Sequence, residues 1–182
     1  MKSIIILISI IILSACTKDN AKLIQIPNGD FESWTNLLPN NWVTNSCPYC
    51  LPAFETYIIQ QDTPAYEGKY AAKFIYNNVY AATAENKFAL SEHPDYLTAN
   101  VKCNHFGNDT VSVKIKLLKN SIAVDSGQWL GTSTMINYIQ IKIPISQTTT
   151  QVDSAVINIK GGNKIGLPAN NTELWIDNLE LK

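Results

Sequence analysis

Arginine is absent from the sequence, and all 14 cationic residues are lysines. With 15 acidic residues the formal net charge is −1, and charged residues make up only 16% of the 182 positions. Proteins that bind nucleic acids present a basic surface, in which arginine commonly pairs with phosphate and guanine. The composition therefore excludes nucleic-acid binding, and the hydrophobic share of 46% excludes a disordered chain. A chain of this length corresponds to one domain.

Long hydrophobic runs are absent except at the start, where Ile4 to Leu13 is almost entirely isoleucine and leucine. This run follows Lys2 and is too short to span a bilayer, which is typical of an export signal. The next residues, Leu13-Ser14-Ala15-Cys16, resemble the lipobox of bacterial lipoproteins. The resemblance implies a signal peptide (1–15), a tether (16–25) lipidated at Cys16, and a folded domain (26–182). An ordinary secretory signal with an incidental cysteine is the alternative.

Long amphipathic helices are missing as well, because apolar residues alternate with a period of two rather than 3.6. β-Branched residues dominate these stretches and favour strands. The segment from Ala81 to Leu90 is the one weak helical candidate, and we expect a loop or a short turn there. The pattern predicts an all-β fold, a two-sheet antiparallel β-sandwich. The alternating stretches are 70–76, 97–103, 111–117, 139–145 and 155–160, with turn residues at 107–109, 119–121, 161–163 and 168–171.

Four motifs in order resemble the galactose-binding-like jelly rolls, a family that includes many carbohydrate-binding modules. They are the run from Pro27 to Trp34, the Pro-Asn-Asn-Trp from Pro39 to Trp42, the Gly-Lys-Tyr strand from Gly68 to Phe74, and the closing strand from Glu173 to Leu181. The resemblance implies a jelly roll over residues 26–182, a glycan ligand and a structural Ca²⁺ ion.

The acids in these motifs suggest where a cation would sit. Phe31 points opposite to Asp30 and Glu32 on an extended chain, so that Phe31 enters the core and the two acids face the rim. Asp177 lies on the last strand, and first and last strands often lie side by side in sandwiches. By resemblance, the Ca²⁺ ligands are Asp30 or Glu32, the backbone near Lys69, and Asp177. The alternative is that these acids cap turns or face water.

The cysteines allow three interpretations. Cys47-Pro48-Tyr49-Cys50 matches the active-site run of glutaredoxins, but no helix follows that would lower a thiol pKa. Outside the cytosol, a Cys47–Cys50 disulfide that pins a loop is the simplest interpretation. A zinc site from both cysteines, Cys103 and His105 is the alternative. Against zinc, Cys103 shares its face with apolar residues, as a small buried side chain does.

Catalytic signatures are scarce. The two histidines, His93 and His105, stand near no serine in a nucleophile-elbow context, and no glycine-rich phosphate loop occurs. The best carboxylate pair, Glu32 with Asp177, is already assigned to the cation. We therefore expect a protein that is not an enzyme.

Binding through aromatic side chains is the better hypothesis, because aromatic rings stack on the apolar faces of sugars. Trp34, Trp42 and Trp175 lie inside the fold motifs and are expected to pack in the core or at its rim. The predicted carbohydrate-binding residues are Trp129, Tyr76, Tyr80, Asn77 and Asn78. The sequence thus predicts a non-catalytic glycan-binding lipoprotein of the bacterial cell envelope, at the outer membrane. The alternatives are an adhesive lipoprotein that binds another protein and a glycoside-active enzyme.

Overall fold

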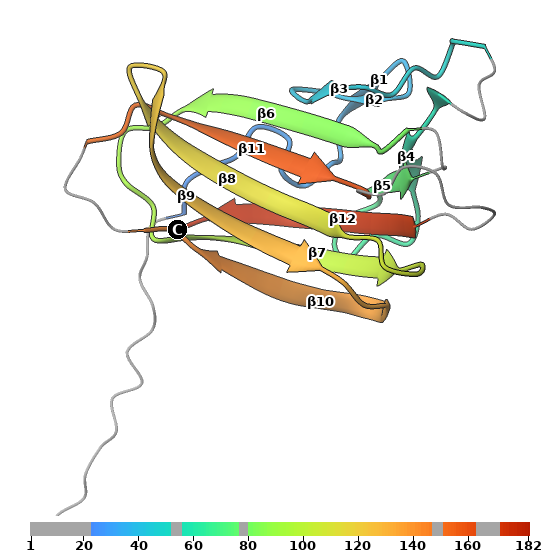
Figure 1. The fold of residues 1–182 in the computed structure, drawn as a ribbon. Helices are drawn as coiled ribbons and strands as arrows, with labels where there is room; N and C mark the ends of the chain where they lie inside the picture. Colours follow the sequence, from blue (N-terminus) through green and yellow to red (C-terminus); the bar gives the residue numbers. More distant parts are fainter. Residues whose placement is uncertain (1–22, 52–55, 77–79, 147–150, 163–171) are drawn as a thin grey trace, which may run out of the picture.

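The alternating apolar residues pack between two antiparallel sheets of five strands each (Figure 1). The computed structural model describes residues 23–51, 56–76, 80–146, 151–162 and 172–182. Sheet 1 has the order β10 (Met135–Pro144), β7 (Tyr96–Asn104), β12 (Thr172–Leu181), β5 (Ala71–Tyr76) and β4 (Ile59–Asp62). Sheet 2 has the order β3 (Val43–Thr44), β6 (Thr83–Ala89), β11 (Ser154–Lys160), β8 (Val111–Lys119) and β9 (Ile122–Gly131). A small hairpin, β1 (Trp34–Thr35) with β2 (Leu38–Pro39), stands at one end.

The predicted all-β sandwich is confirmed, and all five alternating stretches are strands. In β8 the inward residues Val111, Val113, Ile115 and Leu117 are fully buried, while the residues between them lie at the outer surface. The inner faces of both sheets join in one hydrophobic core. Burial of these side chains supplies most of the folding free energy, at about 25 cal/mol per Å² of apolar surface.

The prediction of a loop or short turn between Ala81 and Leu90 is wrong, because this segment forms β6. Its inward positions are Ala84, Asn86 and Phe88, so a polar residue interrupts the apolar alternation. The buried Asn86 amide donates a hydrogen bond to the Pro27 carbonyl at 2.7 Å. A tertiary partner therefore satisfies this amide, and the strand forms against its weak local preference.

The sequence pattern also did not predict strand β9. Its inward positions include Asp125 and Gly127, so apolar residues do not alternate regularly there. A side chain at Gly127 would meet the Pro144 carbonyl oxygen at 2.5 Å, because β9 and β10 approach closely at the edge of the sandwich. Glycine is required there by space rather than by backbone conformation.

The turn predicted at 119–121 joins β8 to β9. Asn120 and Ser121 both have positive φ values, 51° and 67°, between the paired residues Lys119 and Ile122. Two consecutive positive φ values are those of a type I′ hairpin turn, whose twist matches that of the flanking strands, and Asn is favoured there.

The first and last described segments lie side by side, as expected. Ile24 pairs with Leu181, and the Leu179 N–H donates to the Gly29 carbonyl at 2.9 Å. Phe31 is fully buried and stacks on Trp42 with ring centroids 5.0 Å apart. The prediction that Phe31 enters the core is therefore confirmed.

A connecting segment, residues 63–70, is fixed to the structure by two carboxylates. Asp177 Oδ2 accepts the N–H groups of Tyr66 (2.9 Å) and Glu67 (3.0 Å). Glu32 Oε1 accepts those of Lys69 (2.7 Å) and Tyr70 (2.8 Å). We call residues 63–70 the strap. Because Asp177 is fully buried, desolvation raises the pKa of its carboxyl, although its N–H donors act in the opposite direction.

Replacing Asp177 by Asn should destabilise the protein. An amide offers one acceptor oxygen where the carboxylate offers two, so at least one buried N–H of the strap or of Asn178 loses its partner. We expect the free energy of unfolding in urea to fall by about 1–3 kcal/mol. The exposed Asp30→Asn variant is the control and should change it by less than about 0.5 kcal/mol. Equal small effects of both substitutions would show that Asp177 does not fix the strap.

Candidate functional site

The five residues predicted to bind carbohydrate do not form one exposed surface. Tyr76 is only 5% exposed, because it lies on the same face of β5 as the buried Phe74. Trp129 pairs with the inward Val113 and packs against the core, half-buried, at the edge strand β9. The interpretation of Tyr76 as an exposed ring is therefore wrong, whereas Trp129 is partly exposed and its binding of carbohydrate stays a prediction. Tyr80 is 46% exposed, and Asn77 and Asn78 lie outside the described residues.

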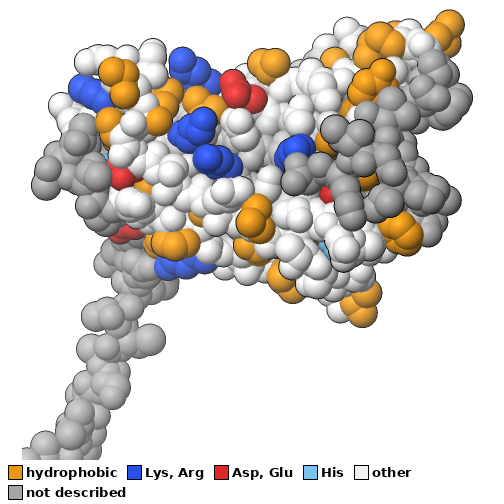
Figure 2. All heavy atoms as spheres, in the orientation of Figure 1, with side chains coloured by type: hydrophobic (Ala, Val, Ile, Leu, Met, Phe, Trp, Pro, Cys, Tyr) orange, Lys and Arg blue, Asp and Glu red, His pale blue; other side chains and the backbone are white. Residues whose placement is uncertain are grey.

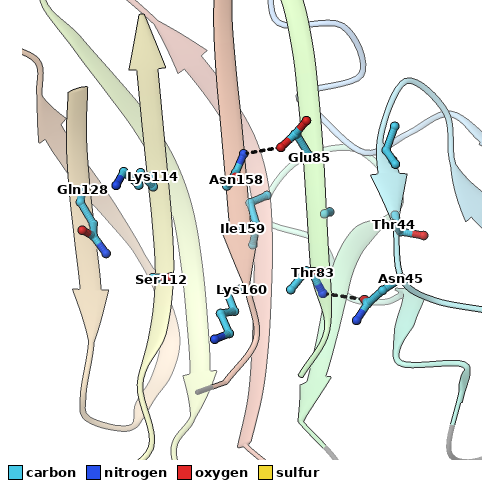
Figure 3. A pocket seen from close by; sticks show the side chains of 12 residues that line it. Thr44, Asn45, Thr83, Glu85, Ser112, Lys114, Gln128, Asn158, Ile159 and Lys160 are labelled. Atoms are coloured by element: carbon cyan, nitrogen blue, oxygen red, sulfur yellow. Dashed lines mark hydrogen bonds between the residues drawn. The ribbon is translucent and has the colours of Figure 1, made fainter. Parts of the chain in front are cut away.

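A groove on the outer face of sheet 2 is the candidate site (Figure 3). It has a volume of about 540 Å³, which lies within the range of ligand pockets in proteins. Its walls come from β3, β6, β11, β8 and β9 (Figure 3). The polar side chains that line it are Thr44, Asn45, Thr83, Glu85, Ser112, Lys114, Gln128, Asn158 and Lys160.

One row of polar side chains crosses the floor of this groove. Glu85, Asn158, Lys114 and Gln128 are consecutive cross-strand partners on β6, β11, β8 and β9. Adjacent strands lie about 4.8 Å apart, so the row spans roughly 14 Å. Asn158 Nδ2 donates to Glu85 Oε2 at 3.2 Å, which fixes the orientation of both groups (Figure 3). We call these four residues the polar row.

The short strand β3 forms one rim of the groove. Asn45 attaches this rim to β6, since its Oδ1 accepts the Thr83 N–H at 2.8 Å (Figure 3). Its Nδ2 also donates to the Ala81 carbonyl at 2.8 Å. Val43 pairs with Glu85 and is 77% exposed. The rim therefore adds an apolar side chain beside the polar row.

The groove offers hydrogen-bond donors, acceptors and charge, but none of its described lining residues is aromatic. Sequence reasoning missed the site because it looked for aromatic residues in loops. The available signal was the polar half of the alternation: Ser112, Lys114, Asn158 and Lys160 occupy the positions between apolar residues that predicted the strands. Which of these polar faces would be hollow depends on how the sheet curves and on where β3 stands, and no local pattern specifies either.

The outer face of sheet 1 carries the aromatic rings instead. Lys73 and Lys102 lie over the Trp175 ring, with their Nζ atoms 4.8 Å and 4.1 Å from the ring centroid. The Trp175 Nε1–H donates to Asp62 at 2.6 Å. Tyr138 donates its hydroxyl proton to the Pro64 carbonyl of the strap, and burial raises its pKa. These rings are occupied by intramolecular contacts.

The predicted calcium ligands lie near one another but face N–H donors. Glu32 and Asp177 accept the backbone N–H groups of the strap, Lys69 supplies one of those donors, and Asp30 is exposed. No group of three His, Cys, Asp or Glu residues in the described ranges is arranged to hold a metal ion. In this arrangement the donors supply the positive potential that a cation would, so the residues do not fit an ion as they stand. Calcium stays a prediction, which calorimetric titration would test.

The cysteine prediction is confirmed for the first pair: Cys47 and Cys50 form a disulfide. Two hydrogen bonds between Cys47 and Thr56 close the same loop. The Cys47 N–H donates to the Thr56 carbonyl at 2.8 Å, and the Thr56 hydroxyl donates to the Cys47 carbonyl at 2.9 Å. The zinc alternative is not supported, since two of its four ligands are bonded to each other. Cys103 is buried, and desolvation raises the pKa of its thiol to about 11.

Thiol counting checks this assignment. In a Cys16→Ser chain, the native protein should show no thiol that reacts at neutral pH, because Cys103 is buried and protonated. Unfolding without reductant should release one thiol, and unfolding with reductant should release three. Three thiols released by unfolding in a chelator without reductant would contradict the disulfide.

Comparisons with known proteins show the fold. No model of a known protein family matches the sequence, and no curated protein sequence matches it. Among solved structures, TmCBM61 in complex with β-1,4-galactotriose is similar with a TM-score of 0.50 and 12% identity, over 85% of this chain and 91% of that one. A Bacteroides thetaiotaomicron protein provisionally named a glycoside hydrolase gives a TM-score of 0.56 and 13% identity, over 78% of this chain and 62% of that one. A cyclase from Fischerella sp. TAU gives 0.56 and 16%, over 88% and 96%.

These likenesses establish that the chain has the β-sandwich fold found in carbohydrate-binding modules. This chain spans less than two thirds of the Bacteroides protein, so the sandwich is only a part of that molecule. The same architecture also occurs in a cyclase. The fold therefore leaves the function open, and the function has to be argued from the groove.

Proposed function

We propose that this protein is a non-catalytic glycan-binding module, and that the groove on sheet 2 receives an oligosaccharide. The observation that carries the proposal is the polar row, in which four hydrogen-bonding side chains lie on four neighbouring strands. The structural similarity to a module that binds β-1,4-galactotriose supports it. A row of polar side chains about 14 Å long suits several sugar units in sequence better than a single sugar.

The sheet makes the polar row a prepared binding surface. Carboxylate and amide oxygens accept hydrogen bonds from sugar hydroxyls, while amide N–H and ammonium groups donate to them. Strand pairing on both sides fixes the backbone at Glu85, Asn158 and Lys114, and the edge strand β9 holds Gln128 from one side. The hydrogen bond between Asn158 and Glu85 fixes those two side chains as well. Little conformational entropy is therefore lost when a ligand binds, which favours affinity.

Two features support binding rather than hydrolysis. Glu85 is the only carboxylate among the described residues that line the groove, whereas most glycoside hydrolases use a pair. Outside the groove, His93 contacts Asp125 at 2.8 Å, but its other ring nitrogen faces the Pro94 carbonyl at 2.9 Å. Both ring nitrogens of His93 are therefore engaged in contacts within the protein.

Removing two members of the polar row should weaken glycan binding without unfolding the domain. A glycan array would identify a ligand for the wild-type protein, and calorimetry would then compare the variants. Asn158→Ala combined with Gln128→Ala removes two hydrogen-bonding groups worth about 1 kcal/mol each, so the Kd should rise about 30-fold. The control is Gln140→Ala, an exposed amide on the outer face of sheet 1.

The outcomes separate the proposed function from its alternatives. An equal loss in the control variant would place the ligand on sheet 1, and an array without any signal would contradict glycan binding altogether. In the second case the exposed Ile136 (82%) and Ile139 (45%) on the edge strand β10 favour the other class, a protein-binding lipoprotein. Release of sugars from a polysaccharide by the pure protein would favour an enzyme.

We also propose that a lipid on Cys16 holds the domain at the bacterial outer membrane. The support is the sequence motif, since residues 1–22 lie outside the described residues. Within the described part of the chain, no helix has the length and hydrophobicity to cross a bilayer.

The lipid anchor is tested by Cys16→Ser. Expressed with its natural leader in a bacterium that makes lipoproteins, the wild-type protein should partition into the detergent phase of a Triton X-114 extract. The variant should move to the aqueous phase, because it has lost its acyl chains. If the two proteins partition alike, Cys16 carries no lipid.

A further inference from the structure

Lysine side chains gather on the outer face of sheet 2. Lys87 and Lys116 flank Val156 in one cross-strand row, Lys114 lies in the polar row, and Lys160 lies in the next row. Figure 2 views this face and shows lysines spread over it. All four side chains therefore point to the same side of the molecule: Lys114 and Lys160 line the groove, and Lys87 and Lys116 lie in the row beside it.

Acidic residues hardly offset this charge. Across the three rows, Glu85 is the only acid beside the four lysines, so the face has a formal charge of +3 in a chain whose total is −1. Asp153 stands just before β11, where its carboxylate accepts the Asn120 N–H and lies 4.0 Å from Lys119. It also interacts with Lys87 and so offsets part of the charge at that end of the face. The acids cluster on the other side, where sheet 1 and its strap carry Asp62, Glu67, Glu173, Asp177 and Glu180.

Lys114 and Lys116 have no compensating charge of their own. Neither takes part in an ion pair with any described residue. They are two positions apart on β8, and therefore project from the same face about 6.6 Å from each other. Like charges this close repel each other, and a bound anion would remove the repulsion.

The lack of an aromatic side chain in the groove strengthens the argument. A neutral sugar is held largely by stacking on rings and by hydrogen bonds, and the described lining residues offer only the hydrogen bonds. A carboxylate or sulfate on the sugar would add charge-assisted hydrogen bonds from lysine, which are about twice as strong as neutral ones.

We infer that the groove binds an anionic glycan, one that carries carboxylate or sulfate groups along its chain. This inference rests on the proposed function and narrows its ligand class. Lys114 and Lys116 contact the acidic groups, and Asn158, Gln128 and Glu85 contact the hydroxyls. Because the lysines are exposed or half-buried, their attraction also acts at a distance and is screened by salt.

The test uses pairs of polymers that share a backbone and differ only in charge. Polygalacturonate is compared with its methyl ester, and dextran sulfate with dextran; the two pairs distinguish a carboxylate ligand from a sulfate ligand. At 50 mM salt, at least one acidic polymer should bind about tenfold or more tightly than its neutral partner. Raising the salt to 500 mM should remove most of that difference.

Matched variants test which lysines are responsible for the preference for acidic polymers. Lys114→Gln combined with Lys116→Gln keeps hydrogen-bonding groups but removes two charges, and should lower the affinity for the acidic polymer about tenfold. Lys142→Gln makes the same substitution on the outer face of sheet 1, over Tyr96, and should leave the affinity unchanged. All variants are exposed or half-buried, and their unfolding midpoints are compared to confirm intact folding.

Each outcome decides one point. Equal binding of charged and neutral partners would overturn the anionic ligand and leave the glycan-binding function standing. Binding of none of the four polymers and no signal on a glycan array would overturn both. Binding of polyglutamate as tightly as of the acidic polysaccharides would also overturn the inference, because it would show a cationic surface without sugar recognition.

Discussion

Burial of one face of every long strand between the two sheets is the constraint on which the rest of the molecule depends. It places Val113, Ile115 and their equivalents in the core, and it therefore sends the intervening residues to the outer faces. The polar row exists because this alternation runs in register across four strands of sheet 2. A shift of one residue in any of these strands would exchange its two faces and remove its member from the row.

The outer faces of the two sheets differ in how they are covered and in their charge. Sheet 1 is partly covered by the strap, which Asp177 and Glu32 fix through backbone N–H groups, and its rings are engaged by lysines. Sheet 2 carries the groove on its outer face, with β3 as one rim. Lysines occur on both outer faces, but most acids of the two sheets lie on the covered side, so a nearly neutral chain presents a groove with net positive charge. The net charge of the whole chain excluded nucleic-acid binding, but it does not show that the two outer faces differ in charge.

Much of the fold could be predicted because period-two alternation is a local property. The five stretches with clean alternation became strands, Phe31 entered the core, and Asn120-Ser121 formed a turn that its sequence favours. The failures were β6 and β9, in which Asn86, Asp125 and Gly127 occupy inward positions. Each of these residues is accommodated by a contact that is distant in the sequence, such as the hydrogen bond from Asn86 to the Pro27 carbonyl. A prediction from local sequence does not include such contacts.

The site was less predictable than the fold. By itself the sequence determined the strand pattern, the Cys47–Cys50 disulfide and the side-by-side ends of the chain, because each follows from neighbouring residues or from a known order of motifs. Only the tertiary structure decided which outer face is open and that Trp129 and Tyr76 turn inward. It also brought together Lys87, Lys114 and Asn158, which are distant in sequence. The physical reason is that sheet order and the position of the strap arise from long-range pairing and packing, which no window of sequence contains.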